Sequence, residues 1–144
     1  NPFFFLDIIA CVAPIGIFLG RIANFINSEL YGKPSNFFWS VIFPKVDTIS
    51  RHPSQLYEAI LEGAILFSVL ITIILKKNIK IGLCSCLFMI LYGVFRIFAE
   101  QFREPDVQIG YLFNLFSMGS VLSFTMILAG LFIFVKMRNN EIYK

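Results

Sequence analysis

The sequence predicts an all-α, polytopic integral membrane protein with about four transmembrane helices. Of its 144 residues, 58% are hydrophobic and the mean hydropathy is +0.79, whereas soluble domains are roughly half apolar. Several apolar segments approach or reach the length of about 20 residues that a helix needs to cross a bilayer. No segment alternates like a barrel strand, and helices satisfy their own backbone hydrogen bonds in lipid.

The predicted helices cover approximately residues 3–20, 58–75, 81–100 and 112–135. The first contains Asp7, the second Glu58 and Glu62, and the third Arg96 and Glu100. An ionised side chain near the middle of a bilayer costs roughly 2.5–3.5 kcal/mol on insertion scales. We therefore expect these helices to pack around a polar interior, whereas the fourth is a simple apolar span.

A connection of more than thirty residues separates the first two helices. Connections this long are usually functional or disordered, and the aromatic run at 37–39 favours an ordered segment at the membrane interface. Lysines and arginines in the connector 76–80 and in the carboxy-terminal tail favour the cytoplasm for that side. We expect a long, ordered, outward-facing connection and a cytoplasmic carboxy-terminal tail.

Composition argues against several classes of function. The net charge of +3 is scattered between apolar spans and forms no basic face, so we expect no nucleic acid partner. Cys11, Cys84 and Cys86 lie in apolar segments without metal-site spacing, so we expect neither a disulfide nor a bound metal. The sequence has no glycine-rich phosphate loop, serine elbow or acidic metal cluster, and we expect no cofactor.

Polar residues form a stripe on the third helix. Tyr92, Arg96, Glu100 and Arg103 are spaced by four, four and three residues, which places them within roughly 80° of one face. Arg96 and Glu100 can pair, leaving Arg103 as an additional cation. If Arg21 meets this stripe, the guanidinium groups can grip a phosphate bidentately. The alternative is a buried arginine–glutamate clamp between helices, with Arg103 reaching the headgroups.

His52 is the single histidine of the chain and lies in the run Arg51-His52-Pro53-Ser54-Gln55-Leu56-Tyr57-Glu58. Histidine is the usual proton acceptor near neutral pH. A histidine beside a proline is more often a hydrogen-bonding support. Both interpretations remain open at this point.

Three ordered blocks resemble the bacterial prolipoprotein diacylglyceryl transferases, collinearly over nearly the whole chain. The first block contains Arg21, Asn24, Asn27, Glu29 and Gly32, and the second is the run 51–58. The third runs from Tyr92 through Arg96, Glu100 and Arg103 to Glu104, Pro105 and Asp106.

The resemblance implies an activity in the bacterial plasma (inner) membrane. Such an enzyme moves the diacylglyceryl group of phosphatidylglycerol to the lipobox cysteine thiol of a prelipoprotein signal peptide, forming a thioether and releasing glycerol phosphate. Its partners are therefore phosphatidylglycerol, the prelipoprotein and membrane lipids, and its own cysteines are spectators. The departing phosphate needs cationic stabilisation.

The implied site lies toward the outer leaflet. The implied catalytic residues are Arg21, Arg96 and Glu100, with Glu100 orienting Arg96. The implied substrate-binding residues are Arg21, Asn24, Asn27, Glu29, Gly32, His52, Tyr92 and Arg103, of which Arg103 would hold the headgroup.

Enzymes of the family are longer, and a His-Gly-Gly-type block lies in an amino-terminal half that has no counterpart here. We therefore expect residues 1–144 to be a single membrane domain, the carboxy-terminal part of a longer enzyme. The resemblance identifies that parent enzyme and not an activity of these residues alone. The alternatives are a non-enzymatic transporter or channel with an anion-binding cavity, and a structural subunit that binds a partner helix.

Overall fold

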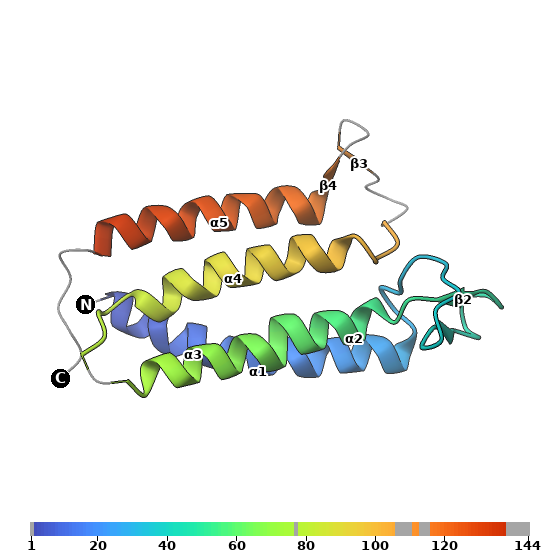
Figure 1. Cartoon of the computed structure of the whole chain (residues 1–144), viewed down its shortest axis with the longest axis horizontal. Coiled ribbons are helices and arrows are strands. Elements are labelled where there is room, and N and C mark those ends of the chain that lie inside the picture. The colour runs from blue at the N-terminus through green and yellow to red at the C-terminus, as the bar shows by residue number, and fades with distance from the viewer. Residues whose placement is uncertain (1, 77, 106–110, 113–115, 138–144) are drawn as a thin grey trace.

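The computed structural model describes residues 2–76, 78–105, 111–112 and 116–137. Within these residues, four helical segments are long and apolar enough to cross a membrane, which confirms the expected mostly helical fold. They are α1 (Pro2–Asn27), the composite of α2 (Ser54–Glu58), η1 (Ala59–Ile65) and α3 (Leu66–Ile74), then α4 (Leu83–Glu100) and α5 (Met118–Lys136). Figure 1 shows the four segments running alongside one another, with α5 against α4.

Helix α1 is longer than the sequence pattern indicates. It continues to Asn27 instead of ending at residue 20, so Arg21 and Asn24 lie inside the helix and not in the connection. The difference has an electrostatic cause, because the Arg21 guanidinium finds carboxylate partners on the neighbouring span. A paired charge can remain in a membrane helix that would otherwise end before it.

The second span contains a π-helical segment, η1, which holds Glu62 and Gly63. Short π-helical segments within α-helices are often found at functional sites. A Cβ atom at Gly63 would lie 2.6 Å from the Cβ of Phe18, so only glycine allows α1 to come this close. This approach brings α1 beside the glutamates of the second span.

Glycines also bring α4 and α5 together. A Cβ atom at Gly93 would lie 2.7 Å from the carbonyl oxygen of Ser123, and one at Gly130 would lie 2.8 Å from Ile90. Membrane helices commonly associate through such small residues, because close packing replaces the hydrophobic effect between them. Helix α5 also exposes large apolar side chains, among them Phe132 at 69%, as a lipid-facing helix would.

Asp7 connects two helices at the end of the bundle where α4 begins. Its buried carboxylate accepts hydrogen bonds from the backbone N–H groups of Gly82, at 2.6 Å, and Ser85, at 2.8 Å, and from the Ser85 hydroxyl. An acid here satisfies amides that the start of α4 would leave unpaired. The charge in the first span therefore ties α1 to α4.

The connection between α1 and α2 is ordered, as expected. Strand β1 (Val41–Ile42) pairs antiparallel with β2 (Ser50–Arg51), and Gly32 bridges to Arg103 beyond α4. Within the connection Arg51 donates to Asp47 at 2.7 Å, and this hydrogen bond lowers the pKa of Asp47 below its usual range. The second short ladder joins β3 (Tyr111–Leu112) to β4 (Phe116–Ser117).

The connection and the end of α4 lie at one end of the bundle, whereas the end of α3 and the end of α5 lie at the other (Figure 1). This arrangement agrees with the expected alternation of helices. Which end faces the cytoplasm remains a prediction. Asp106 and the tail beyond Met137 lie outside the described residues.

Candidate active site

Arg21 and Arg96 meet on one carboxylate. Arg21 reaches from α1 and places Nε 2.8 Å from Glu58 Oε2, and Arg96 reaches from α4 and places Nη1 2.7 Å from the same oxygen. Glu58 is the last residue of α2, immediately before the π-helical segment. Two arginines that are far apart in the sequence therefore converge, as the phosphate-binding hypothesis requires.

Two further carboxylates complete this charged cluster. Glu62 lies 3.6 Å from Arg21 Nη2 and 3.6 Å from Arg96 Nη1, and Glu100 Oε2 lies 3.0 Å from Arg96 Nη2. Among the described residues, the cluster thus joins two guanidinium groups and three carboxylates. Its formal charge is −1, because the second span adds two carboxylates whereas α1 adds one guanidinium group.

The charged cluster is buried. The side chains of Glu58 and Glu62 are 1% and 0% exposed, and that of Arg96 is 10% exposed. Removing one partner of a buried ion pair typically costs about 3–5 kcal/mol, because the other charge stays buried without compensation. The charged cluster therefore holds α1, the second span and α4 together. The buried arginine–glutamate clamp and the convergence of the two arginines, which the sequence analysis gave as alternatives, occur in the same set of contacts.

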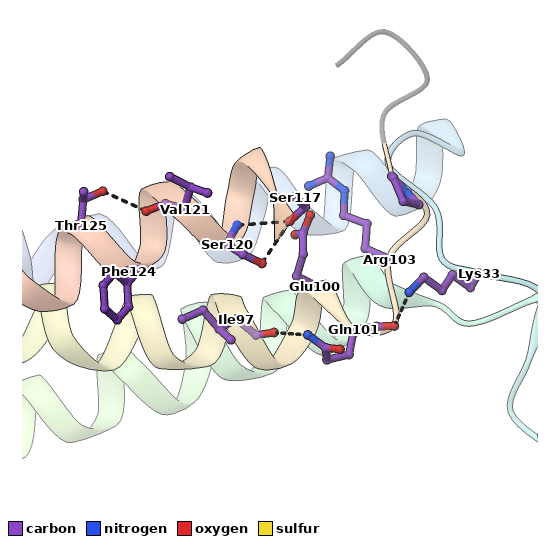
Figure 2. Close-up of a pocket in the computed structure, with 11 residues that line it drawn as sticks. Lys33, Ile97, Glu100, Gln101, Arg103, Ser117, Ser120, Val121, Phe124 and Thr125 are labelled. Atoms are coloured by element: carbon purple, nitrogen blue, oxygen red, sulfur yellow. Dashed lines mark hydrogen bonds between the residues drawn. The ribbon is translucent and has the colours of Figure 1, made fainter. Parts of the chain in front are cut away.

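A cavity of about 670 Å³ opens beside the cluster, between the end of α4 and the start of α5. Figure 2 shows Lys33 and Arg103 toward one end and Val121 and Phe124 toward the other. Its walls are formed by Lys33, Ile97, Glu100, Gln101, Arg103, Pro105, Ser117, Ser120, Val121, Phe124 and Thr125. Cationic groups at one end and apolar groups at the other suit an amphiphilic ligand.

Glu100 belongs to both the cluster and the cavity. Its carboxylate contacts Arg96 and also lines the cavity wall. On the facing helix, a Cβ atom at Gly119 would lie 3.1 Å from Glu100 Oε2, so a glycine leaves room for this carboxylate. The hydroxyl of Ser117 accepts a hydrogen bond from the backbone N–H of Ser120, which caps α5 at the same wall (Figure 2).

Lys33 is a cavity residue that the sequence analysis missed. Its ammonium group donates to the carbonyl oxygen of Gln101 at 2.9 Å, while its backbone N–H donates to the carbonyl oxygen of Phe102. Lysines are common in polar connections, and nothing in the local sequence marks this one. Its position follows from the pairing of the connection with the chain beyond α4.

Gly32 is a predicted site residue whose identity the packing of the backbone explains. Its backbone N–H donates to the carbonyl oxygen of His52, and its own carbonyl oxygen accepts from Arg51. A Cβ atom would collide with the His52 carbonyl oxygen and lie 2.8 Å from that of Phe102. Only glycine fits this position between two backbone segments.

The other predicted residues of the first block lie near the end of α1. Asn24 is half-buried, whereas Asn27 and Glu29 are exposed, and the Glu29 carbonyl oxygen accepts from the Gln55 amide at 2.7 Å. Leu30, with φ of 52°, adopts the left-handed conformation that bulky residues rarely enter. Ser54 donates to its carbonyl oxygen and so helps to hold this turn.

The remaining two predicted residues lie outside the ion-paired group. The ring of Tyr92 is half-buried one helical turn before Arg96 and stacks on Phe88 with centroids 5.7 Å apart. His52 packs among aromatic rings in the connection, where its Nδ1 lies 3.0 Å from the Tyr57 hydroxyl. The structure thus brings Arg21, Arg96 and Glu100 together, and His52 takes no part in the ion pairs that the described residues form.

Comparison with known proteins places this arrangement in a family. The model of the prolipoprotein diacylglyceryl transferase family matches residues 1–136. The chain belongs to this family. The match extends over α1 to α5, so it includes every element that contributes to the charged cluster and the cavity.

Several curated transferases of Rickettsia are similar to the chain. The phosphatidylglycerol–prolipoprotein diacylglyceryl transferase of Rickettsia bellii (strain OSU 85-389) is 52% identical over 140 residues, which cover 96% of this chain and 53% of that protein. That of Rickettsia rickettsii (strain Sheila Smith) is 55% identical over 126 residues, covering 86% and 49%. The chain therefore spans about half the length of the curated relatives it matches.

In this transferase-family chain, Glu58 and Glu62 are the site candidates that sequence reasoning missed. They provide the shared contacts of both arginines. Two glutamates four residues apart inside an apolar span were the available signal, since buried acids need partners. Pairing Glu58 and Glu62 with the two arginines would have predicted the charged cluster.

Proposed function

We propose that the complete protein containing this chain transfers the diacylglyceryl group of phosphatidylglycerol to the lipobox cysteine thiol of a prelipoprotein. Family membership supports the reaction, and the names of the relatives include both substrates. The observation that carries the site is the double role of Glu100, which joins the buried arginines to the wall of an amphiphilic cavity.

The cavity suits a lipid in size and polarity. Its volume of about 670 Å³ lies within the range of about 300–1,000 Å³ that ligand sites commonly have. In the proposal, Arg103 and Lys33 hold the anionic headgroup, and the diacylglyceryl portion extends toward Ile97 and Phe124. Exposed residues Asn27 and Glu29 contact the glycerol hydroxyls or the peptide, where their polar side chains remain accessible.

The proposed reaction is a displacement at carbon. The substrate thiolate attacks the glyceryl carbon that bears the phosphate ester, a C–S bond forms, and the C–O bond to phosphate breaks. Glycerol phosphate leaves, and its phosphate takes up the proton that the substrate thiol lost, so that charge is conserved. Arg96 and Arg21 stabilise negative charge on the departing phosphate, and Glu100 orients Arg96 from 3.0 Å.

The remaining candidate residues have supporting roles in the proposal. Asn24 positions Arg21 from the same helix, and Gly32 lets the connection approach Arg103 closely. Tyr92 lies one turn from Arg96 and faces the lipid glyceryl group. The polar end of the bundle faces the outer leaflet of the plasma membrane, and the carboxy-terminal tail is cytoplasmic.

Lipidation of a prelipoprotein peptide by the complete enzyme tests the proposal. Arg21→Ala and Arg96→Ala should abolish thioether formation with phosphatidylglycerol, measured by mass spectrometry, because the leaving phosphate loses its cations. Lys45→Ala is the matched control, since Lys45 is an exposed cation of the connection outside the cavity. This control variant should retain the activity of the unsubstituted enzyme.

Membrane insertion and a native elution profile show that the arginine variants fold. Normal lipidation by both well-folded variants would contradict the proposed site. Ion flux in proteoliposomes without any lipid turnover would instead support a channel or transporter and would contradict the proposed reaction.

A further inference from the structure

A chain of hydrogen bonds links three aromatic side chains at the amino-terminal end of the second span. The indole Nε1 of Trp39 lies 2.6 Å from the hydroxyl oxygen of Tyr57, and this hydroxyl lies 3.0 Å from Nδ1 of His52. Trp39 and His52 belong to the connection, whereas Tyr57 lies in α2. The chain therefore couples the connection to the helix that ends at Glu58.

The direction of the protons follows from the chemistry of the three groups. An indole N–H can only donate, so the Tyr57 oxygen accepts from Trp39. The phenol oxygen could accept a second hydrogen bond from Nδ1–H, but its own proton would then have no acceptor within the described part of the chain, where its other partner is His52 Nδ1. The arrangement that satisfies all three groups has Tyr57 donating to an unprotonated Nδ1, with the proton of the neutral imidazole on Nε2.

Ring packing holds the imidazole in this orientation. The His52 ring lies 5.5 Å from that of Phe37, 5.9 Å from that of Tyr57 and 5.3 Å from that of Phe102, measured between centroids. These neighbours come from the connection, from α2 and from the segment after α4. A rotated ring would lose the bond to Tyr57, so the packing and the hydrogen bond select one orientation.

We infer that Tyr57, itself oriented by Trp39, is a positioning residue that holds His52 as the neutral Nε2–H tautomer. In this state His52 offers a hydrogen-bond donor to a phosphate or hydroxyl oxygen of the lipid, and it does not take the thiol proton. A general base needs an unprotonated nitrogen facing its substrate, and here that nitrogen is bonded to Tyr57. The claim that the acceptor is a lipid rests on the proposed function, whereas the claim about the tautomer of His52 does not.

The tautomer can be measured directly in the complete protein. Nitrogen-15 NMR of histidine-labelled protein distinguishes a protonated from an unprotonated ring nitrogen, and the His52 signals are those that disappear in His52→Gln. We expect one Nε2–H tautomer in the unsubstituted protein. Tyr57→Phe keeps the ring but removes the donor, so its His52 signals should shift toward a mixture of tautomers.

Tyr31→Phe is the control for the loss of a tyrosine hydroxyl. The Tyr31 ring packs under the Arg51 guanidinium, and its hydroxyl has no hydrogen-bond partner in the described ranges. This variant should leave the His52 signals unchanged. A dominant Nδ1–H tautomer, a charged imidazole at neutral pH, or unchanged His52 signals in Tyr57→Phe would each overturn the inference.

Kinetics test the donor role separately. The side-chain amide nitrogen of glutamine reaches the position of Nε2, whereas that of asparagine reaches the position of Nδ1. His52→Gln should therefore keep the KM for phosphatidylglycerol within about twofold, and His52→Asn should raise it about fivefold with little change in kcat. Tyr57→Phe should also act mainly on KM.

A base would behave differently. Losses of kcat of about 100-fold or more in both His52 variants would show that His52 transfers a proton and would overturn the donor role. If the complete protein transfers no lipid at all, the proposed function fails while the NMR result still decides the tautomer. The two failures can thus be told apart.

Discussion

Glu58 and Glu62 are both buried glutamates of the second span, yet we expect Glu58→Gln to destabilise the protein more than Glu62→Gln. Each substitution removes one negative charge and keeps the size of the side chain. Each leaves two guanidinium groups and two carboxylates in the cluster. Because burial and side-chain size are matched, the difference between the variants reports mainly how closely each carboxylate approaches the two guanidinium groups.

The magnitude follows from the distances. Glu58 contacts Arg21 at 2.8 Å and Arg96 at 2.7 Å, whereas Glu62 lies 3.6 Å from each. At an effective dielectric constant of about 20, a contact at the shorter distance contributes about 6 kcal/mol of Coulomb attraction and one at the longer distance about 4.6 kcal/mol. Both carboxylates are almost fully buried, so their desolvation costs nearly cancel in the comparison. Each glutamate has two such contacts, so the total Coulomb attraction of Glu58 exceeds that of Glu62 by about 3 kcal/mol.

Reversible unfolding of the complete protein by a denaturing detergent, followed by circular dichroism, measures this difference. Glu104→Gln is the control, because Glu104 is 40% exposed and its contact with Arg51 should contribute less than about 1 kcal/mol. Equal destabilisation by Glu58→Gln and Glu62→Gln, or a larger effect of Glu62→Gln, would refute the reasoning from contact distance.

Three further predictions concern other parts of the fold. Gly93→Ala should destabilise the packing of α4 and α5 by about 1–3 kcal/mol in the same unfolding assay, whereas Gly16→Ala, which has open space, should be neutral or slightly stabilising. Asp7→Ala should cost about 1–2 kcal/mol, because the amides at the start of α4 lose their acceptor, and Asp7→Asn should recover part of it. Arg51 lowers the pKa of Asp47, so this ion pair stabilises the connection above the unfolded pKa and is lost as pH falls through the folded pKa. Carbon-13 NMR should therefore show a higher titration midpoint for Asp47 in Arg51→Gln, and an unchanged midpoint would contradict that cause.

Local patterns predicted much of the fold and part of the site. Long apolar runs are sufficient to locate membrane helices, since a lipid environment leaves the backbone few alternatives. The spacing of Arg96 and Glu100 predicted their ion pair, because residues four apart are neighbours on any α-helix. The extension of α1 through Arg21 was not predicted, because it depends on a carboxylate that another span supplies.

The sequence by itself determined the membrane class, the approximate spans, the stripe on α4 and the resemblance to a family of lipid transferases. Only the tertiary structure decided that Arg21 and Arg96 share Glu58, that Lys33 borders the cavity, and that Tyr57 bonds to His52. The physical reason is that helical periodicity relates residues along a single span. Contacts between spans depend on how the helices rotate and approach one another, and glycines such as Gly63 and the π-helical turn set that approach in three dimensions.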